Sequence, residues 1–369
     1  MKRTLSILMI LAMLLTATAC GRVQLPVELP PLPTPTQAPA ADTAETVPAQ
    51  AVQAEATPTP EPAPTPTPEP TPRPLLPVEL NESSLDPSIF APAEEKGELV
   101  FQTYETCDYE SGLPDRITKT MAVYLPYGYD EEKQYDVLFL LHTSGGDENT
   151  WLGYEHAYTI PDQGTLSVSM VNMLDNMIQQ GRCAPLIVVG PSCYVYPGAA
   201  AAHNSARDFE QFDQEFSQDL LPFVAEHYAT YAADGSPEAL AQAREHFGIL
   251  GASFGAYVNY ISIFATHLDL AAWYCFVGGG GIDYSYVTER WSARGMMELP
   301  IDCLYIVEGE YDDRFGPESS YNTLKTIERF NDQNLRYSII QGAGHEPRAW
   351  VNGLYNSLEL FFRDTAGAA

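Results

Sequence analysis

One serine, flanked by glycines, stands between a strand-like run and a helix-like segment. Residues 247–250 are apolar, Gly251-Ala-Ser253-Phe-Gly255 follows, and residues 256–264 have the apolar content of a buried helix. Strand, sharp turn and helix are the setting of a nucleophile elbow, which raises a serine hydroxyl above the edge of a sheet. Glycines two residues to either side let the two backbones approach without Cβ clashes. The pattern predicts an α/β fold with Ser253 as a nucleophile.

An acidic partner is expected downstream, because this fold presents serine, acid and histidine in that chain order. Residues 303–307 read as a buried strand that runs into Glu308-Gly-Glu310-Tyr-Asp312-Asp313. A carboxylate at that point would emerge at the carboxyl end of the strand. We expect Asp312 to be the acid, with Asp313, Glu308 and Glu310 as open alternatives.

The expected base is His345. It follows a short strand predicted at residues 337–340 and precedes the apolar-periodic residues 350–362. An imidazole titrates near neutral pH, so it can take the serine proton and return it to a leaving group. A buried carboxylate would fix its tautomer and stabilise the imidazolium. Ser253, Asp312 and His345 therefore form the predicted triad.

An oxyanion hole requires backbone N–H donors aimed at the developing negative charge. One donor should be Phe254, the residue after the nucleophile. The second should come from Thr143 or Ser144, in the loop that follows the strand predicted at residues 136–141. The alternative is that this loop is only a glycine-rich connection.

From about residue 99 to residue 362 the chain resembles a carbohydrate-esterase family. That family includes the feruloyl esterase modules of bacterial xylanases and belongs to the esterase D-like α/β-hydrolases. Besides the elbow, the resemblance rests on residues 141–151, residues 216–231, residues 237–246 and Gly344-His345 with residues 353–362. It implies a mostly parallel sheet with helices on both faces. It also implies a serine esterase that uses Ser253, Asp312 and His345.

Three departures from the family pattern concern the substrate site. The family writes His-Gly-x-Gly where this chain has His142-Thr143-Ser144-Gly145, so residue 143 cannot adopt a positive φ as cheaply as glycine. Glu346-Pro347-Arg348 follow His345 in place of aromatic residues, and residues 278–284 lack a tryptophan. We therefore expect an acyl pocket that favours small acyl groups. Tyr284 and Tyr286 are the candidates to line it.

The first twenty residues predict a lipoprotein signal peptide. Lys2-Arg3 precede an apolar run over residues 5–15, and small residues lead to Cys20 in a pattern that resembles a bacterial lipobox. The run is too short to cross about 30 Å of hydrocarbon. Lipidation of Cys20 would anchor an extracytoplasmic protein at the cell surface. The alternatives are an ordinary signal peptide cut near Ala19 or a short membrane anchor.

Residues 21–80 are rich in proline, threonine, alanine and glutamate, with a Thr-Pro-Thr-Pro-Glu-Pro unit repeated. Proline fixes φ and removes donors, so no core can form there. We expect a disordered, extended spacer that reaches about 150 Å. A proline-motif ligand for another protein is the alternative.

Residues 81–369 are long enough for one α/β-hydrolase domain. Continuous apolar runs, typical of a covered parallel sheet, alternate with helical patterns at residues 167–180 and 212–228. The expected strands are residues 121–125, 137–141, 186–189, 247–250, 273–277, 303–307 and 337–340.

Charge limits the partners that the chain can bind, and the cysteines limit its disulfides and metal sites. The chain carries 19 basic and 49 acidic residues, a net charge of −30. We therefore do not expect nucleic acid as a partner, and polyanionic wall polymers would be repelled, whereas neutral polysaccharide is compatible. Five cysteines accompany Cys20, of which Cys183 and Cys193 flank a strand and can form a disulfide if oxidised. No spacing of Cys or His indicates a metal site, and no cofactor is expected.

The sequence therefore predicts a surface-tethered serine esterase that acts through an acyl-enzyme on a carbohydrate-linked ester. One alternative is an acyltransferase of the mycolyl-transfer type, in which another acceptor takes the acyl group. The other is a catalytically silent, glycan-binding surface lipoprotein.

Overall fold

The computed structural model describes residues 75–109, 116–196, 206–279, 281–314 and 317–363. The predicted signal peptide, Cys20 and nearly all of the predicted spacer lie outside these residues.

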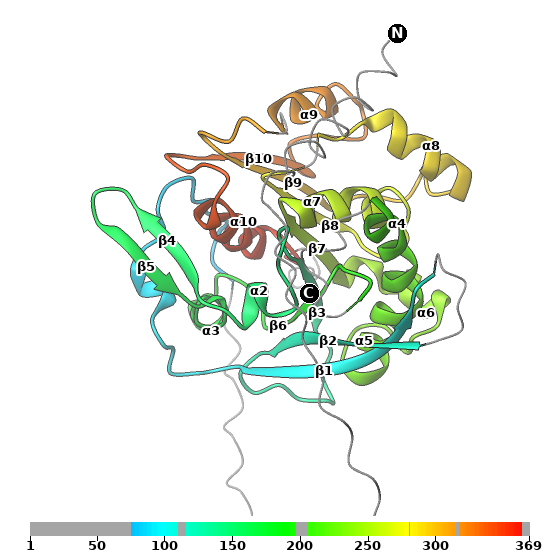
Figure 1. Cartoon of the computed structure of the whole chain (residues 1–369), viewed down its shortest axis with the longest axis horizontal. Coiled ribbons are helices and arrows are strands. Elements are labelled where there is room, and N and C mark those ends of the chain that lie inside the picture. Colours follow the sequence, from blue (N-terminus) through cyan, green and yellow to red (C-terminus); the bar gives the residue numbers. More distant parts are fainter. Residues whose placement is uncertain (1–74, 110–115, 197–205, 280, 315–316, 364–369) are drawn as a thin grey trace, which may run out of the picture. The chain divides into compact units, whose positions relative to one another are not determined.

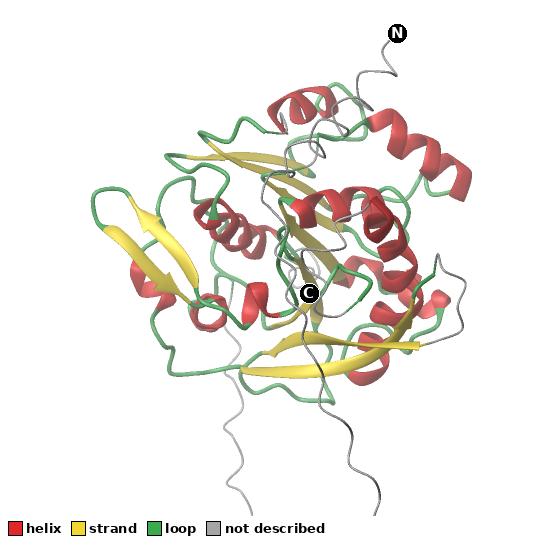
Figure 2. Cartoon of the chain, in the orientation of Figure 1, coloured by secondary structure: helices red, strands yellow, loops and turns green. Residues whose placement is uncertain are grey.

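A central sheet of eight strands organises the fold (Figures 1 and 2). In spatial order the strands are β1 (Glu98–Cys107), β2 (Arg116–Leu125), β6 (Leu186–Pro191), β3 (Asp136–Leu141), β7 (Phe247–Ala252), β8 (Trp273–Val277), β9 (Cys303–Gly309) and β10 (Leu335–Ile340). Strand β2 pairs antiparallel with both β1 and β6, and all other pairs are parallel. The predicted α/β-hydrolase fold is confirmed.

Helices connect the strands, and a two-stranded hairpin lies apart from the main sheet. The hairpin consists of β4 (His156–Ile160) and β5 (Gly164–Val168). The α-helices are α2 (Asn149–Leu152), α3 (Met170–Gln179), α4 (Ala206–Glu215), α5 (Leu221–His227), α6 (Pro237–Gln242), α7 (Phe254–Val258), α8 (Tyr284–Arg294), α9 (Pro317–Leu324) and α10 (Pro347–Leu360). Short 3₁₀ segments are η1 (Pro87–Phe90) and η3 (Arg244–His246), and π-helical segments are η2 (Phe216–Leu220) and η4 (Asn259–Phe264).

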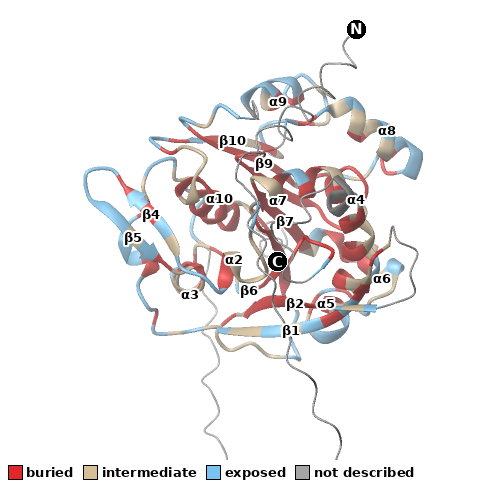
Figure 3. Ribbon diagram, viewed as in Figure 1, coloured by how far each residue is buried: buried red, intermediate tan, exposed pale blue. Residues whose placement is uncertain are grey.

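The inner strands β6, β3, β7, β8 and β9 are buried along their whole length, whereas the edge strand β1 is largely exposed or half-buried (Figure 3). Alternate residues of β3 point to opposite faces, so Val137 and Phe139 join one core while Leu138 and Leu140 join the other, all fully buried. Residues of η2, α5, η4 and α8 fill the first core, and residues of α3 and α10 fill the second. This two-sided burial explains why the strands read as continuous apolar runs.

The segment before η1 is held against α10 by side-chain amides. Asn81 donates its backbone N–H to Asn356 Oδ1 at 2.8 Å, and Asn352 donates Nδ2–H to the carbonyl of Ser83 at 2.7 Å. Both α10 asparagines are fully buried. These bonds satisfy backbone groups that lie outside any strand.

The expected strands are all present, and three features differ from the expectations. Strand β1 and the β4–β5 hairpin were not expected. The helix expected from residue 167 begins at Met170, because Ser169 caps it while Ser167 pairs with Ala157 in the hairpin. The helical pattern at residues 212–228 is one part of a longer helical stretch that contains the π-turn η2.

Cys183 and Cys193 are both free thiols. They belong to the cores on opposite faces of the sheet, so the disulfide considered above does not form. Among the described residues, no helix is both long and apolar enough for a membrane crossing, and no cluster of potential metal ligands occurs.

Candidate active site

Ser253 lies at a strained turn between β7 and α7. Its φ of 53° and ψ of −113° fall in a region that residues other than glycine rarely adopt. Its backbone N–H donates to Val277 O at 2.8 Å, which fixes the turn to the neighbouring strand. Strain of this kind persists only where surrounding structure holds it, and it is found at functional sites.

The two glycines of the motif are required by close backbone contacts. A Cβ at position 251 would lie 2.1 Å from the carbonyl oxygen of Gly255, and one at position 255 would lie 2.3 Å from that of Leu141. No side chain larger than hydrogen fits at either position. The reason given for the glycines in the sequence therefore holds in the structure.

The structure brings the three predicted triad residues together. Ser253 Oγ lies 2.7 Å from His345 Nε2, and His345 Nδ1 lies 2.7 Å from Asp312 Oδ2. The Asp312 and His345 side chains are only 3% and 11% exposed. Ser253 follows β7, Asp312 follows β9 and His345 follows β10, so parallel strands deliver all three to one edge of the sheet. This geometry allows the serine proton to pass to Nε2 while the carboxylate holds Nδ1–H.

The alternative acids lie elsewhere. Asp313 is exposed. Glu308 accepts the Tyr337 hydroxyl, and burial raises the pKa of its carboxyl. Glu310 accepts the Gly342 N–H at 2.7 Å. The geometry therefore favours Asp312.

An aromatic residue contacts the triad histidine, although no aromatic neighbour of His345 was predicted from the sequence. Trp350 of α10 lies edge-on to His345, with 4.7 Å between ring centroids and 82° between planes. A Cβ at Gly278 would lie 2.5 Å from the Trp350 ring, so this glycine is needed for the tryptophan to fit. Trp350 comes five residues after His345, where the sequence offered only the apolar period of a helix.

The loop after β3 adopts its turn without a positive φ at Thr143. The left-handed position falls at Gly145, with φ of 77°. Gly146 donates its N–H to Thr143 O at 3.0 Å, and Gly145 donates its N–H to the Tyr194 hydroxyl at 2.8 Å. The replacement of the family's glycine by Thr143 is thus accommodated two residues later.

His142 fixes the orientation of the peptide between Thr143 and Ser144. Its Nε2 accepts the Cys193 N–H at 2.9 Å, so the proton of the neutral ring is on Nδ1, 2.8 Å from Thr143 O. Burial lowers the pKa of His142 to about 4, which keeps it neutral near pH 7. In a trans peptide the N–H points opposite to the C=O. The Ser144 N–H is therefore directed away from His142.

A buried ion pair holds the β6 side of this loop. Lys119 Nζ lies 2.5 Å from Glu215 Oε1 and donates to Ser192 O at 2.9 Å, with both charged side chains at most 5% exposed. Ser192 precedes Cys193, the partner of His142. The ion pair therefore fixes the backbone next to Cys193, whose N–H donates to His142.

Phe254 is the first residue of α7, so its N–H lies outside the hydrogen-bond ladder of the helix. Its ring stacks on Tyr194 with 5.4 Å between centroids and on His142 with 5.9 Å. The two predicted sources of oxyanion donors, Phe254 and the residue 143–144 loop, are therefore joined by one aromatic cluster.

Comparison with known proteins finds similarity to xylanases and to feruloyl esterases. No family model matches the chain. The endo-1,4-beta-xylanase Y of Acetivibrio thermocellus is 34% identical over 199 residues, which cover 54% of this chain and 15% of that protein. An endo-1,4-beta-xylanase/feruloyl esterase of Xylanibacter ruminicola is 24% identical over 262 residues, 66% of this chain and 29% of the relative. The chain thus spans less than a third of the length of either curated relative.

Among solved structures, a feruloyl esterase module from Clostridium thermocellum, complexed with sinapinate, superposes with a TM-score of 0.61 at 25% identity. The match covers 79% of this chain and 95% of that module. The chain has the α/β-hydrolase fold of these feruloyl esterases and is similar to them in sequence.

The two tyrosines expected to line the substrate site, Tyr284 and Tyr286, pack around α8. Tyr284 lies edge-on to Trp291 and Phe330, with centroids 6.2 and 6.0 Å away. Tyr286 lies 5.7 Å from Tyr260, with the Arg290 guanidinium 3.5 Å above its ring. These contacts join α8 to its own neighbours and not to the triad. Their role in binding stays a prediction.

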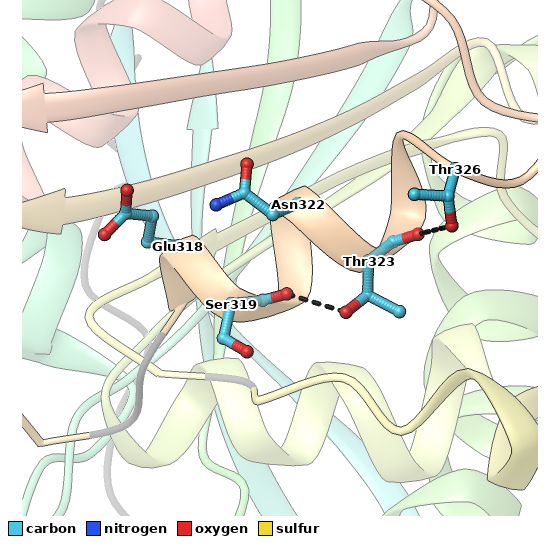
Figure 4. Close-up of a pocket in the computed structure, with 5 residues that line it drawn as sticks. All are labelled: Glu318, Ser319, Asn322, Thr323 and Thr326. Carbon is cyan, nitrogen blue, oxygen red and sulfur yellow. Dashed lines mark hydrogen bonds between the residues drawn. The ribbon is translucent and has the colours of Figure 1, made fainter.

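A surface hollow over α9 contains none of the triad residues (Figure 4). It is lined by Glu318, Ser319, Asn322, Thr323 and Thr326. The Thr323 and Thr326 hydroxyls donate to the carbonyls of Ser319 and Thr323, at 2.8 and 2.7 Å. Hydroxyl protons committed to backbone carbonyls are not available to a ligand, so we place the active site at the triad and not here.

Proposed function

We propose that the protein is a serine carboxylic-ester hydrolase that acts through an acyl-enzyme. The observation that carries the proposal is the continuous hydrogen-bonded chain from Ser253 through His345 to Asp312, with both links at 2.7 Å. A hydroxyl, an imidazole and a buried carboxylate in this order are the components of an activated serine nucleophile.

The first half of the reaction forms the acyl-enzyme. Ser253 Oγ attacks the ester carbonyl carbon while His345 Nε2 takes the hydroxyl proton. The carbonyl oxygen becomes negative, and backbone N–H groups of Phe254 and of Thr143 or Ser144 stabilise it. Collapse of the intermediate breaks the bond to the alcohol oxygen, which receives the proton from His345. The acyl group remains on Ser253.

The second half releases the acid. Water gives its proton to His345 Nε2 and its oxygen attacks the acyl carbon, and the same N–H groups stabilise the second oxyanion. Cleavage of the bond to Ser253 Oγ returns the proton to the serine. The Asp312 carboxylate stays ionised and stabilises the imidazolium in both halves.

As substrates we propose feruloyl or acetyl esters of plant-type polysaccharide such as xylan. The names of the relatives support this class, since one is a xylanase/feruloyl esterase and the solved module binds sinapinate. The net charge of −30 supports a neutral or weakly charged carrier over a polyanion.

We further propose that a lipid on Cys20 anchors the protein outside the cytoplasm, at the surface of a bacterial cell. The support is the residue pattern alone, a basic start, an apolar run and small residues before the cysteine. The proline-rich residues 21–80 would then hold the esterase away from the membrane.

Assays of the purified protein on short-chain and feruloyl chromogenic esters, and on feruloylated xylan oligosaccharides, test the proposal. We expect the alcohol and the free acid to be released in separate steps, with a burst of alcohol release on substrates for which deacylation is the slower step. Transfer of the acyl group to an added sugar in place of water would identify an acyltransferase. Absence of both hydrolysis and transfer would contradict the proposal and favour a catalytically silent binding protein.

A further inference from the structure

Five tyrosines of the described residues expose more than a third of their surface. Their exposed fractions range from 38% for Tyr231 to 71% for Tyr311, with Tyr154, Tyr196 and Tyr257 between them. Tyr311 is the most exposed of all the large apolar side chains that the structure describes.

Four of the five share the edge of the sheet that carries the triad. Tyr196 follows β6, Tyr257 lies in α7 directly after β7, and Tyr311 follows β9. Tyr154 comes after α2, and its hydroxyl bonds Asp147 in the loop that follows β3. These four strands run parallel, so their carboxyl ends, and the residues that follow them, lie at one edge. We call Tyr154, Tyr196, Tyr257 and Tyr311 the tyrosine rim.

The fifth tyrosine lies at the opposite edge. Tyr231 stacks on His246 with 3.5 Å between ring centroids, and His246 immediately precedes β7. His246 also pairs with Asp136, the first residue of β3, at 2.8 Å. Exposed tyrosines are thus concentrated at the catalytic edge, and Tyr231 supplies an internal control.

Hydrogen bonds hold the backbone of Tyr311 and the rings of Tyr154 and Tyr196 in place, although all three residues are exposed. The Tyr311 N–H donates to Ala343 O at 2.9 Å, which joins the acid loop to the histidine loop directly beside Asp312. The hydroxyls of Tyr154 and Tyr196 donate to Asp147 and Asp108 at 3.1 and 2.7 Å. A ring whose position is already fixed loses little conformational entropy when a ligand covers it.

We propose that the tyrosine rim binds the neutral glycan chain that carries the ester, by stacking of tyrosine rings on sugar rings. The inference rests on the proposed function. A pyranose presents an apolar C–H face bordered by hydroxyls, and tyrosine presents a flat apolar face with a polar tip. A polymer-linked ester that reaches Ser253 must leave its carrier outside the site, where the loops of the rim lie.

Charge selects the glycan over other partners. A chain with 49 acidic and 19 basic residues repels polyanions, and uncharged sugars are unaffected. The rim residues are separate tyrosines on three loops and on helix α7, whereas a protein-binding face is expected to be one contiguous apolar patch.

The test compares polymeric and small substrates in the full chain. Tyr311→Ala and Tyr257→Ala should each raise KM for feruloylated or acetylated xylan roughly threefold to tenfold, the scale of one aromatic stacking contact. Their kcat/KM for 4-nitrophenyl acetate, which has no glycan, should change less than twofold. Tyr311→Phe keeps the ring and should retain wild-type KM. Tyr231→Ala, at the other edge, should affect neither substrate.

Binding without catalysis separates this inference from the proposed function. In native gels that contain soluble xylan, Ser253→Ala protein should migrate more slowly than in gels without xylan. The double variant with Ser253→Ala and Tyr311→Ala should lose most of this shift. An equal rise in KM for both substrates would overturn the proposal that the tyrosine rim binds glycan. An effect on xylan no larger than that of Tyr231→Ala would overturn it as well. Failure of the wild-type protein to hydrolyse any ester would instead overturn the proposed esterase activity, and the gels would still decide whether the rim binds glycan.

Discussion

The Tyr194 hydroxyl accepts the backbone N–H of Gly145 at 2.8 Å, although 49 residues separate them in the chain. Gly145 has the left-handed φ of 77° on which the turn after β3 depends. The Tyr194 ring also stacks on Phe254, the residue after the nucleophile. One buried tyrosine therefore sets the position of both predicted parts of the oxyanion hole.

Replacement of Tyr194 by phenylalanine should lower kcat about tenfold on a small chromogenic ester and leave KM unchanged. The ring stack survives, but the loop that presents the residue 143–144 amides loses its hydrogen bond, and a full oxyanion donor contributes about 10²- to 10³-fold. Steady-state kinetics check this. Tyr196→Phe removes a hydroxyl from the same segment without touching Gly145, and should be near wild type. An unchanged kcat in Tyr194→Phe would exclude this role.

His142 should make the fold less stable in acid. Its pKa is about 4 because burial disfavours the charged ring, whereas an unfolded histidine titrates near 6.5. Between these values the unfolded chain binds the extra proton, so this contribution to stability is intact above about pH 6.5 and falls by about 1.4 kcal/mol per pH unit as pH drops toward 4.

His142→Gln should remove that part of the pH dependence. A glutamine amide can accept from Cys193 N–H and donate to Thr143 O without titrating. Urea unfolding at several pH values between 4 and 7 measures the difference. Parallel stability curves for wild type and variant would contradict a neutral, buried His142.

Asp312→Asn should reduce kcat roughly 10⁴-fold, because an amide beside Nδ1 favours the wrong imidazole tautomer. Asp313→Asn is the matched control, since its side chain is exposed and its loss should change kcat less than twofold. Circular dichroism would establish that both variants fold. The reverse pattern of activities would move the acid by one residue.

Acetyl and other short esters should be hydrolysed at least as fast as feruloyl esters. The predicted pocket lacks the usual aromatic neighbours after His345, and loss of one aromatic stacking contact lowers discrimination by about threefold to tenfold. Trp350 does contact His345, but it is 7% exposed and offers little ring surface to a substrate. A kcat/KM for methyl ferulate more than about a hundredfold above that for a short-chain acetate would show that the pocket is specific for feruloyl groups.

Expressed in a bacterium that processes lipoproteins, the protein should partition into detergent as an acylated form that begins at Cys20. Cys20→Ala should be released or left unprocessed. Mass spectrometry of the mature N-terminus is the measurement. An unmodified N-terminus at another residue of the wild type would rule out the anchor.

Local pattern was enough to predict much of this fold. Continuous apolar runs identified the buried parallel strands, and the glycine spacing around Ser253 identified the elbow, because both are dictated by neighbours in the chain. Strand β1 (Glu98–Cys107) was missed because polar residues interrupt its apolar ones and most of its residues are exposed or half-buried. It therefore has no continuous apolar run. The β4–β5 hairpin was missed because Ser167 and Val168 were assigned to the following helix.

Long-range contacts at the site were out of reach of such patterns. The role of His142 depends on the backbone of Cys193, 51 residues away, and that of Trp350 depends on the space left by Gly278. Thr143 was expected to disfavour the turn, because no local pattern shows that Gly145 adopts the positive φ in its place. Sequence order can propose the triad, whereas the supports of its oxyanion loop require the folded chain.

The most direct test of the account is fluorophosphonate labelling of the protein, with the modified peptide located by mass spectrometry and kcat measured in parallel. We expect one label per chain, on Ser253, with complete loss of esterase activity. Ser253→Ala should fold normally, take no label and lose on the order of 10⁶ in kcat. An active Ser253→Ala protein, or a label on any other residue, would contradict an acyl-enzyme at Ser253.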